Sequence, residues 1–286
     1  MDRADYLLRD GQALGLDFAQ YDLDRLVSNL VLIKTPELGY MTAVNEPGLA
    51  ALESYCVTRS RSHQVFVRHH KVCQVATALR YASMRLMDTS TAAPLLDFLS
   101  KLKNLATDHD RKEALHSYAI LDDGWWFQQL RGLQSSTDEP LLSACLDVAL
   151  DRGPRLKSLW KRKGDLSPDQ LDAFKQHIKN WTSPETGKVR LQDTRRRLIS
   201  RGVLFTFFRF RPFVEVRDVE NRDSVMLIRS KGGQLRPVSQ MSPLVRHLRE
   251  LWEEDIHLYA FAGKSNTITI DQLLDLMTSD EPTTQI

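Results

Sequence analysis

The sequence contains few cysteines and none of the pairings that build a disulfide framework or a zinc site. Cys56, Cys73 and Cys145 are far apart and odd in number, which is typical of a protein from a reducing compartment. Neither a CxxC nor an HExxH pattern occurs, so no familiar zinc motif is offered. We therefore expect a cytoplasmic protein that has no disulfide bonds.

Long apolar runs are also missing. No run approaches the roughly 20 apolar residues that a membrane-spanning helix needs, so neither a membrane span nor a membrane partner is expected. The chain does not open on a charged segment followed by an apolar one, so no signal peptide is expected. Internal repeats and low-complexity tracts are not found. Hydrophobic content of 42% and charged content of 27% are ordinary for a globular protein.

The front part of the chain, up to about residue 180, has a mainly helical pattern. A first helix is predicted at 2–14, ended by Gly15, and "VLIKTPELGYMTAV" is typical of a short hairpin. A long helix with a possible bend follows to about Met87. Segment 151–157 is predicted to be a turn, and the polar segment 161–194 is interpreted as solvated helices or a linker. The other expected helices begin near Asp22 or cover 94–106, 110–118 with 123–132, and 139–150.

The pattern changes near Arg201. "VLFTFFRFRPFVEV", "SVMLIRS" and "IHLYAFA" are rich in β-branched and aromatic residues and are predicted to be strands. An amphipathic helix is expected after Pro243, and "TIDQLLDLMTS" is expected to form a terminal helix. The predicted fold is therefore mainly α, with a smaller C-terminal α/β unit.

The first helix carries polar residues in a regular pattern. Asp2, Tyr6 and Asp10 lie at positions i, i+4 and i+8 and so share one face, while Asp5 and Arg9 can pair on a neighbouring stripe. This face is either a solvated helix end, where acidic residues suit the helix dipole, or a face that meets a metal and a polar ligand. The spacing alone does not decide between the two.

Polar residues also interrupt the long helix that follows. Arg59, His63, His70 and Gln74 recur at helical spacing between apolar ends, with Arg61 among the cationic residues beside them. Polar groups inside a packed helix need partners, and arginine offers a bidentate fork to phosphate. The alternative is a basic stretch exposed to solvent.

Several segments together resemble the HD-domain phosphohydrolases. They are "DRADYLLRDGQALGLDFAQYDLDRLV", "GLAALESYCVTR", "VRHHKVCQVATALRYA" and "LDDGWWFQQLRGLQSSTDEPLLSACLDVALDRGPRLK", in the order of that family, and the likeness extends to the C-terminal β segment. The branch is the one that contains the dNTP triphosphohydrolases (dGTPases) and the sterile-alpha-motif HD enzyme of animals. The resemblance implies an HD-type helical domain over residues 1–160, a helical linker over 161–200 and a small α/β domain over 201–286. It also suggests a homo-oligomer.

The resemblance assigns roles to individual residues. Asp2 matches a ligand of the divalent metal, and Arg3 matches a basic position at phosphate. Tyr6 and Asp10 match positions at the sugar of a nucleoside triphosphate. An arginine that faces phosphate matches either Arg59 or Arg61, and ring and phosphate positions of that helix match His63 and His70.

The sequence departs from the family at the metal site. The family's first histidine and its His-Asp pair precede the aspartate that matches Asp2, and here only Met1 does so. His109-Asp110 is interpreted as part of a solvated loop, and Gln12-Ala13 replaces the family's Tyr-His. We expect the chain to correspond to the back part of such an enzyme, with no catalytic residue of its own and no hydrolysis by the isolated chain. A polypeptide that carries the histidines is then a partner; alternatively, the chain is a non-catalytic remnant or scaffold subunit.

Two further motifs remain. "QDTRRRLISRG" concentrates basic residues that suit nucleic acid phosphates, an allosteric nucleotide or a solvated linker helix, namely Arg195, Arg196, Arg197 and Arg201. "AGKSNT" has no upstream glycine to complete a phosphate loop and is predicted to be a turn. Trp125 and Trp126 are predicted to be core or interface aromatics.

Overall fold

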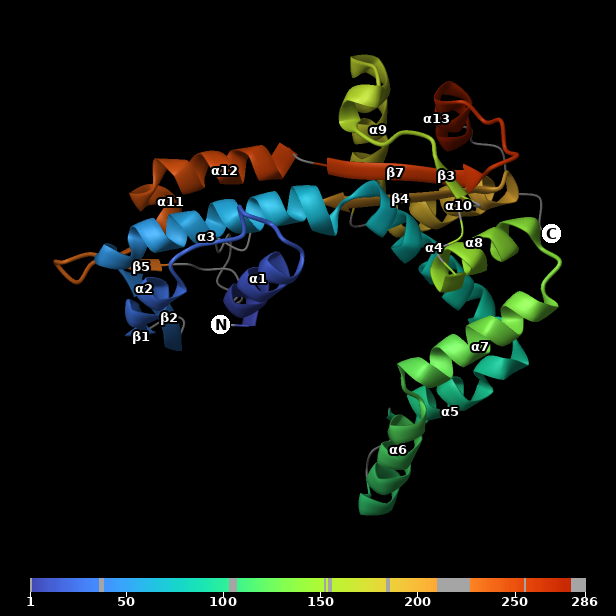
Figure 1. Ribbon diagram of the computed structural model, residues 1–286, viewed down its shortest axis with the longest axis horizontal. Helices are drawn as coiled ribbons and strands as arrows, with labels where there is room; N and C mark the ends of the chain where they lie inside the picture. The colour runs from blue at the N-terminus through green and yellow to red at the C-terminus, as the bar shows by residue number, and fades with distance from the viewer. Residues whose placement is uncertain are drawn as a thin grey trace. The chain divides into compact units, whose positions relative to one another are not determined.

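The computed structural model describes residues 2–35, 39–102, 107–151, 153, 156–183, 186–209, 227–254 and 256–278. The chain forms two compact units, each built from two stretches of sequence (Figure 1). Unit 1 comprises Met1–His69 and Phe207–His257, and unit 2 comprises His70–Thr206 and Leu258–Ile286. The described residues are mainly helical with small sheets, as the sequence predicts. None of their helices combines the length and the apolar character that crossing a membrane requires.

Unit 1 combines helices with a four-stranded sheet of order β1-β2-β5-β6. Strands β1 and β2 form the antiparallel hairpin that the sequence predicts, β5 adds to β2 in parallel, and β6 pairs with β5 in an antiparallel sense. The helix α3 packs against α1, α2 and α12. The elements are α1 (Asp2–Ala13), α2 (Leu23–Ser28), β1 (Leu30–Thr35), β2 (Gly39–Asn45), α3 (Leu49–Ser62), β5 (Leu227–Arg229), β6 (Leu235–Pro237), α11 (Val238–Met241) and α12 (Pro243–Glu254).

The core of unit 1 joins residues that are distant in sequence. Leu52 and Cys56 of α3 are fully buried, as are Ile228 of β5 and Val245 of α12. Burying such side chains contributes about 1.5–3 kcal/mol each relative to leaving them exposed. This packing fixes α3 between the N-terminal helices and the segment that begins at residue 227, so α3 is the central element of the unit.

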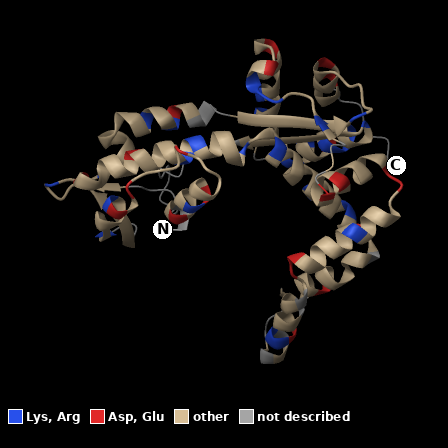
Figure 2. Ribbon diagram, in the orientation of Figure 1, with Lys and Arg blue, Asp and Glu red and all other residues tan. Residues whose placement is uncertain are grey.

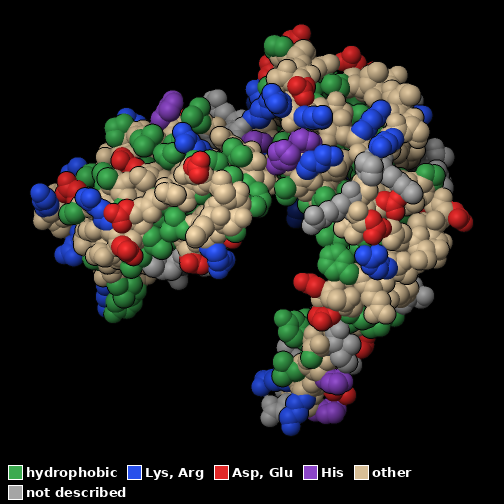
Figure 3. Space-filling model, viewed as in Figure 1, with side chains coloured by type: hydrophobic (Ala, Val, Ile, Leu, Met, Phe, Trp, Pro, Cys, Tyr) green, Lys and Arg blue, Asp and Glu red, His purple; other side chains and the backbone are tan. Residues whose placement is uncertain are grey.

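Unit 2 begins with α4, which packs against α7 and α8, while α9, α10 and α13 pack together. A three-stranded sheet has the order β3-β7-β4. On α5 and α6, which pack against each other, apolar side chains such as Leu99 and Tyr118 are exposed (Figure 3). The elements are α4 (His70–Met87), α5 (Ala93–Leu102), α6 (Asp108–Ile120), α7 (Asp123–Ser136), α8 (Pro140–Asp151), β3 (Leu156–Ser158), α9 (Pro168–Trp181), α10 (Gly187–Ser200), β4 (Val203–Arg209), β7 (Ile256–Gly263) and α13 (Ile270–Thr278).

An aromatic cluster forms part of the core of unit 2. The ring of Phe174 lies 5.2 Å from that of Trp160 and 6.0 Å from that of Phe205, and Trp181 contacts Phe205 edge-on at 5.5 Å. The indole N–H of Trp160 donates to the carbonyl oxygen of Leu258 at 2.8 Å, so the ring's polar atom is satisfied inside the core. Helix α9, which the polar pattern of 161–194 marks as solvated or linker-like, therefore contributes buried aromatics.

Three details differ from the expectation or refine it. The segment 151–157, predicted to be a turn, ends in strand β3, which pairs with β7 through Leu156 and Gly263. His109 lies in the first turn of α6 rather than in a loop, although it is exposed as expected. The predicted strand beyond residue 209 lies outside the described residues. The "AGKSNT" motif begins with the last two residues of β7, and the predicted turn follows at Lys264 and Ser265. The domain boundaries at 160 and 200 stay a prediction, since compactness does not show which segments fold by themselves.

The turn between α9 and α10 requires a glycine at position 187. A Cβ there would lie 2.2 Å from the backbone oxygen of Trp181, which cannot move aside as a flexible side chain could. We predict that Gly187→Ala lowers the free energy of unfolding by about 1–3 kcal/mol through this overlap. Gly132→Ala in α7 is the matched control, because nothing lies within 4 Å of its new Cβ.

Gly132→Ala should raise the stability by about 0.5–1 kcal/mol, since alanine restricts the unfolded chain more than glycine does. Thermal or urea denaturation followed by circular dichroism measures both variants. A Gly187→Ala protein as stable as the parent would show that α10 does not approach α9 this closely.

Candidate functional site

The site begins where α1 packs against α3. Ala4 and Leu7 of α1 are buried in the core of unit 1, and the Tyr21 hydroxyl donates a hydrogen bond to the Ala4 carbonyl oxygen. Gly15, with φ of +65°, lets the chain turn after α1 ends at Ala13. These contacts hold α1 in one place, so the polar residues on its face have defined neighbours.

Tyr55 of α3 is the centre of a polar and aromatic cluster. Its ring meets that of Tyr21 edge-on at a centroid distance of 5.3 Å, and only 4% of the residue is exposed. Burial raises the pKa of the Tyr55 hydroxyl, whereas the charge of Arg59 and a hydrogen bond from its guanidinium act in the opposite direction. Tyr6 of α1 is close enough to raise this pKa further. Tyr6 and Arg59, some 50 residues apart, therefore meet around one side chain.

Arg59 is a charged residue inside this core. It is 7% exposed, whereas Arg61 is exposed to solvent. An arginine is almost never buried unless other groups compensate its charge, and the Tyr55 hydroxyl is one such group. Of the two arginines that the resemblance leaves open, Arg59 is thus the one that lies beside Tyr6 and Tyr55.

The helix changes its geometry just after Arg59. His63, which is half-buried, donates its backbone N–H toward the carbonyl oxygens of Arg59 and Ser60 and opens a π-helical turn, His63–Val67. The α-helix resumes at His70 as α4. Such π-helical turns often occur at functional sites. The long helix predicted to run to about Met87 is therefore interrupted at the bend that the sequence leaves open.

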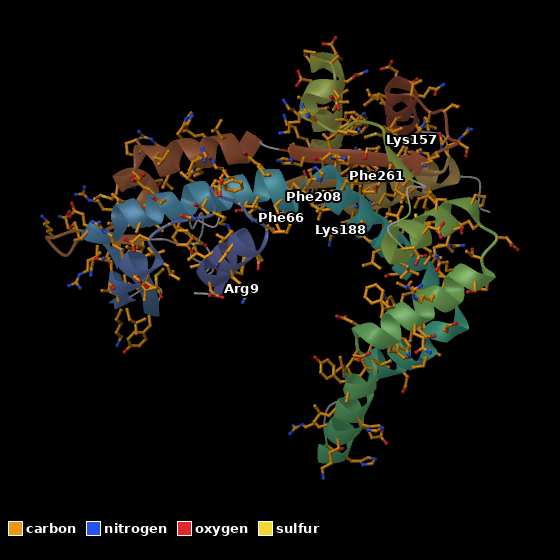
Figure 4. All side chains as sticks on the ribbon, in the orientation of Figure 1. Arg9, Phe66, Lys157, Lys188, Phe208 and Phe261 are labelled. Carbon is orange, nitrogen blue, oxygen red and sulfur yellow. The ribbon has the colours of Figure 1, made fainter. Side chains whose placement is uncertain are left out.

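The remaining predicted residues are placed as follows. Asp10 lies on the half-exposed side of α1 and pairs with Arg9, whose Nε is 3.6 Å away; Arg9 also pairs with Asp5 at 3.3 Å (Figure 4). Asp2 and Arg3 begin α1, and their side chains lie outside the described part. His70 opens α4 and belongs to unit 2. The structure thus places Tyr6 and Arg59 near Tyr55, and His63 follows Arg59 by one helical turn. The functional roles of all six residues and Asp2 stay predictions.

The surroundings of Gln74 and Cys56 give these two polar residues structural rather than chemical roles. The Gln74 amide donates to the Leu156 carbonyl oxygen at 3.0 Å and so joins α4 to β3. Burial raises the pKa of the Cys56 thiol to about 12, which leaves it protonated at neutral pH and unreactive as a nucleophile. Neither residue therefore adds chemistry to the site.

No group of three or more His, Cys, Asp or Glu side chains that could hold a metal ion occurs among the described residues. Protein sites for transition metals take three or four such ligands. The described side chains thus do not form a complete metal centre, and the side chain of Asp2, the predicted ligand, is not among them.

Sequence reasoning missed Tyr21 and Tyr55, which link α1 to Arg59. A signal was present for Tyr55, because it precedes Arg59 by four residues and so lies on the same face of α3. No comparable signal existed for Tyr21, since its position depends on how the loop after α1 folds back.

The comparisons with known proteins bear on the fold. No protein-family model matches the chain, and no curated protein matches it. Among solved structures, the chain is similar to a phosphohydrolase from Bacteroides thetaiotaomicron, with a TM-score of 0.54, 15% identity, and coverage of 92% of this chain and 60% of that one. A hypothetical protein from Aquifex aeolicus has a TM-score of 0.48 and 17% identity, over 96% of this chain and 56% of that one. The chain therefore has a phosphohydrolase-like fold and spans about three fifths of that phosphohydrolase.

The difference in burial between Arg59 and Arg61 predicts opposite outcomes for the same substitution. Arg59→Gln should lower the free energy of unfolding by about 1–3 kcal/mol, because the shorter neutral side chain breaks the hydrogen bond to Tyr55 inside the core. Arg61→Gln should change it by less than about 0.5 kcal/mol, as surface substitutions do. Urea denaturation compares the two. Equal effects would contradict the burial of Arg59.

Proposed function

We propose that this chain is part of an HD-family phosphohydrolase that acts on deoxynucleoside or nucleoside triphosphates. The observation that carries the proposal is that Tyr6 of α1 packs against the core that contains Tyr55, while Arg59 lies one helical turn after Tyr55 on α3. The resemblance of the same segments to the dNTP triphosphohydrolase branch predicts this arrangement. The phosphohydrolase-like fold supports the proposal independently of these residues.

The residue types suit a nucleoside triphosphate. A guanidinium held in a pocket of low dielectric interacts strongly with phosphate oxygens, and its planar fork can donate two hydrogen bonds to them. The Tyr6 hydroxyl can donate or accept at a sugar, and the Asp10 carboxylate can accept from a sugar hydroxyl. The bound triphosphate would then run from α1, at the sugar, toward Arg59 on α3 and His63 at the start of the π-helical turn.

The family resemblance also implies a divalent metal. Asp2 is the residue that would contribute to it, and a single carboxylate does not hold a catalytic transition metal at useful affinity. We propose in addition that a partner polypeptide supplies the His and His-Asp ligands. The proposal also includes a homo-oligomer and a cytoplasmic location. The described residues of this chain do not by themselves form the metal's site.

A second candidate function is a non-catalytic subunit that keeps the scaffold. The lack of a metal-holding group among the described side chains favours it. Nucleotide binding separates the two candidates, because a pure scaffold has no reason to retain the Tyr6–Tyr55–Arg59 arrangement as a ligand site.

The test uses the isolated chain and one dNTP at a time, with magnesium, manganese or iron(II). We predict no hydrolysis, but binding that calorimetry or fluorescence detects. Tyr6→Phe should weaken that binding about fivefold, the equivalent of one lost hydrogen bond of about 1 kcal/mol. Tyr40→Phe is the matched control, since Tyr40 is 70% exposed on the β1–β2 hairpin.

Two results would contradict the proposal in different ways. Absence of any dNTP binding would favour the scaffold. Hydrolysis by the isolated chain that disappears in Asp2→Ala would show that this chain forms a complete metal site by itself.

A further inference from the structure

A cavity of about 300 Å³ lies in unit 2 between α4, α10 and β4. Arg80 comes from α4, Arg195 and Arg196 from α10, and Phe205 from β4. Figure 2 shows basic residues on both α4 and α10. This volume lies at the lower end of the range for small-molecule pockets, which favours a small ligand over a polymer.

Two of the arginines repel each other across this cavity. Burial and the nearby charge of Arg80 lower the pKa of the Arg195 guanidinium. Among the described residues, no carboxylate forms an ion pair with either of them. Arg196, by contrast, pairs with Asp193 at 3.3 Å. The edge of the cavity therefore carries two positive charges, the half-buried Arg195 and the exposed Arg80, and no described carboxylate forms an ion pair with either.

Glu139, the acidic residue that contacts the cavity wall, already has two partners. Tyr81 lines the cavity, and its hydroxyl donates to Oε1 of Glu139 at 2.5 Å. The other oxygen of Glu139 pairs with Nη2 of Arg85 at 3.1 Å. Glu139 thus balances Arg85, and its charge is not available to Arg80 and Arg195.

The rest of the wall combines apolar side chains with the polar side chains of Thr77, Gln192 and Thr206. Met84, Ile199, Leu204 and Phe205 line it, and Phe205 continues into the aromatic cluster with Phe174 and Trp181. Leu204 and Phe205 are buried and belong to strand β4, so this part of the wall is fixed by the core of the unit. The cavity therefore offers a rigid apolar surface next to a doubly positive edge.

We propose that this cavity binds a small phosphate monoester whose body is apolar or aromatic. Its phosphate, with a charge near −2, matches the two arginines better than a carboxylate with a charge of −1 does. Arginine forks bind phosphate oxygens in pairs, and the apolar wall receives the body of the ligand. Of the interpretations that the basic run 195–201 leaves open, this one gives Arg195 a role that a solvated linker helix lacks.

The proposal does not depend on the function proposed above, because its residues all belong to unit 2 and the Tyr6–Arg59 cluster belongs to unit 1. Arg59→Gln, if it folds, should leave binding at the cavity unchanged. Failure of one proposal therefore leaves the other standing.

The experiment measures binding of phenylphosphonate to the full chain by calorimetry, at a mildly alkaline pH where the probe is a dianion. Its carbon–phosphorus bond resists hydrolysis, so a phosphohydrolase activity cannot consume it. We expect a Kd below about 1 mM. Inorganic phosphate should bind at least about tenfold more weakly, because it lacks the apolar body, and so should benzoate, because it carries only one charge.

Matched variants locate the binding. Arg195→Gln and Arg80→Gln should each weaken phenylphosphonate binding about tenfold or more. Arg190→Gln removes one charge from the exposed side of the same α10 and should have less than about a twofold effect. Because Arg195→Gln relieves repulsion, its melting temperature should equal or exceed that of the parent chain; a structural arginine would show a fall instead.

Three results would overturn the proposal. They are no binding of phenylphosphonate, an equal loss of affinity in Arg195→Gln and Arg190→Gln, and a melting temperature that falls in Arg195→Gln while affinity is unchanged. Benzoate binding as tightly as phenylphosphonate would overturn the assignment of phosphate, and equal binding of inorganic phosphate would overturn the apolar body.

Discussion

A positive charge lies inside the helical core of unit 1, and the arrangement around it depends on that charge. Arg59 is 7% exposed on a helix whose neighbours Leu52 and Cys56 are fully buried. Moving a guanidinium from water into such surroundings is unfavourable unless polar groups compensate it. Tyr55 supplies one hydrogen bond, and its own position depends on Tyr21, which in turn holds α1 through the Ala4 carbonyl oxygen. The packing of α1 and α3 is thus coupled to the burial of a single arginine.

Arginine side chains lie in different surroundings in the two units. In unit 1, Arg59 is buried next to tyrosine hydroxyls, whereas in unit 2 Arg80 and Arg195 face each other at a cavity without a described carboxylate partner. Local rules of burial and charge are often violated at functional sites. Both of our proposals therefore use an anionic ligand, while the surroundings differ: hydroxyl groups in the first unit and a partly apolar wall in the second.

Local patterns in the sequence predict much of this fold. The segment "VLIKTPELGYMTAV" correctly predicts the β1–β2 hairpin, and Pro243 correctly marks the start of α12. Strand β3 has only three residues and forms by pairing with β7 about 100 residues later, which no local pattern reports. The apolar stripe of Phe174, Ile178 and Trp181 recurs at helical spacing on α9, although the polar residues around it favour a solvated helix. Of the site, the sequence predicts Tyr6, Arg59 and His63, but not Tyr55 as their link or Arg80 as the neighbour of Arg195, since both depend on packing between helices.

A double-mutant cycle between Tyr55 and Arg59 tests the central claim most directly. Tyr55→Phe removes only the hydroxyl, Arg59→Gln removes the charge, and the free energy of unfolding is measured for the parent chain, both single variants and the double variant. Directly interacting residues in one hydrogen-bonded network couple by about 0.5–3 kcal/mol. We predict a coupling energy in this range, with the second substitution costing less once the first has been made. Strictly additive effects, within about 0.3 kcal/mol, would contradict the claim that Tyr55 holds a buried Arg59 in place.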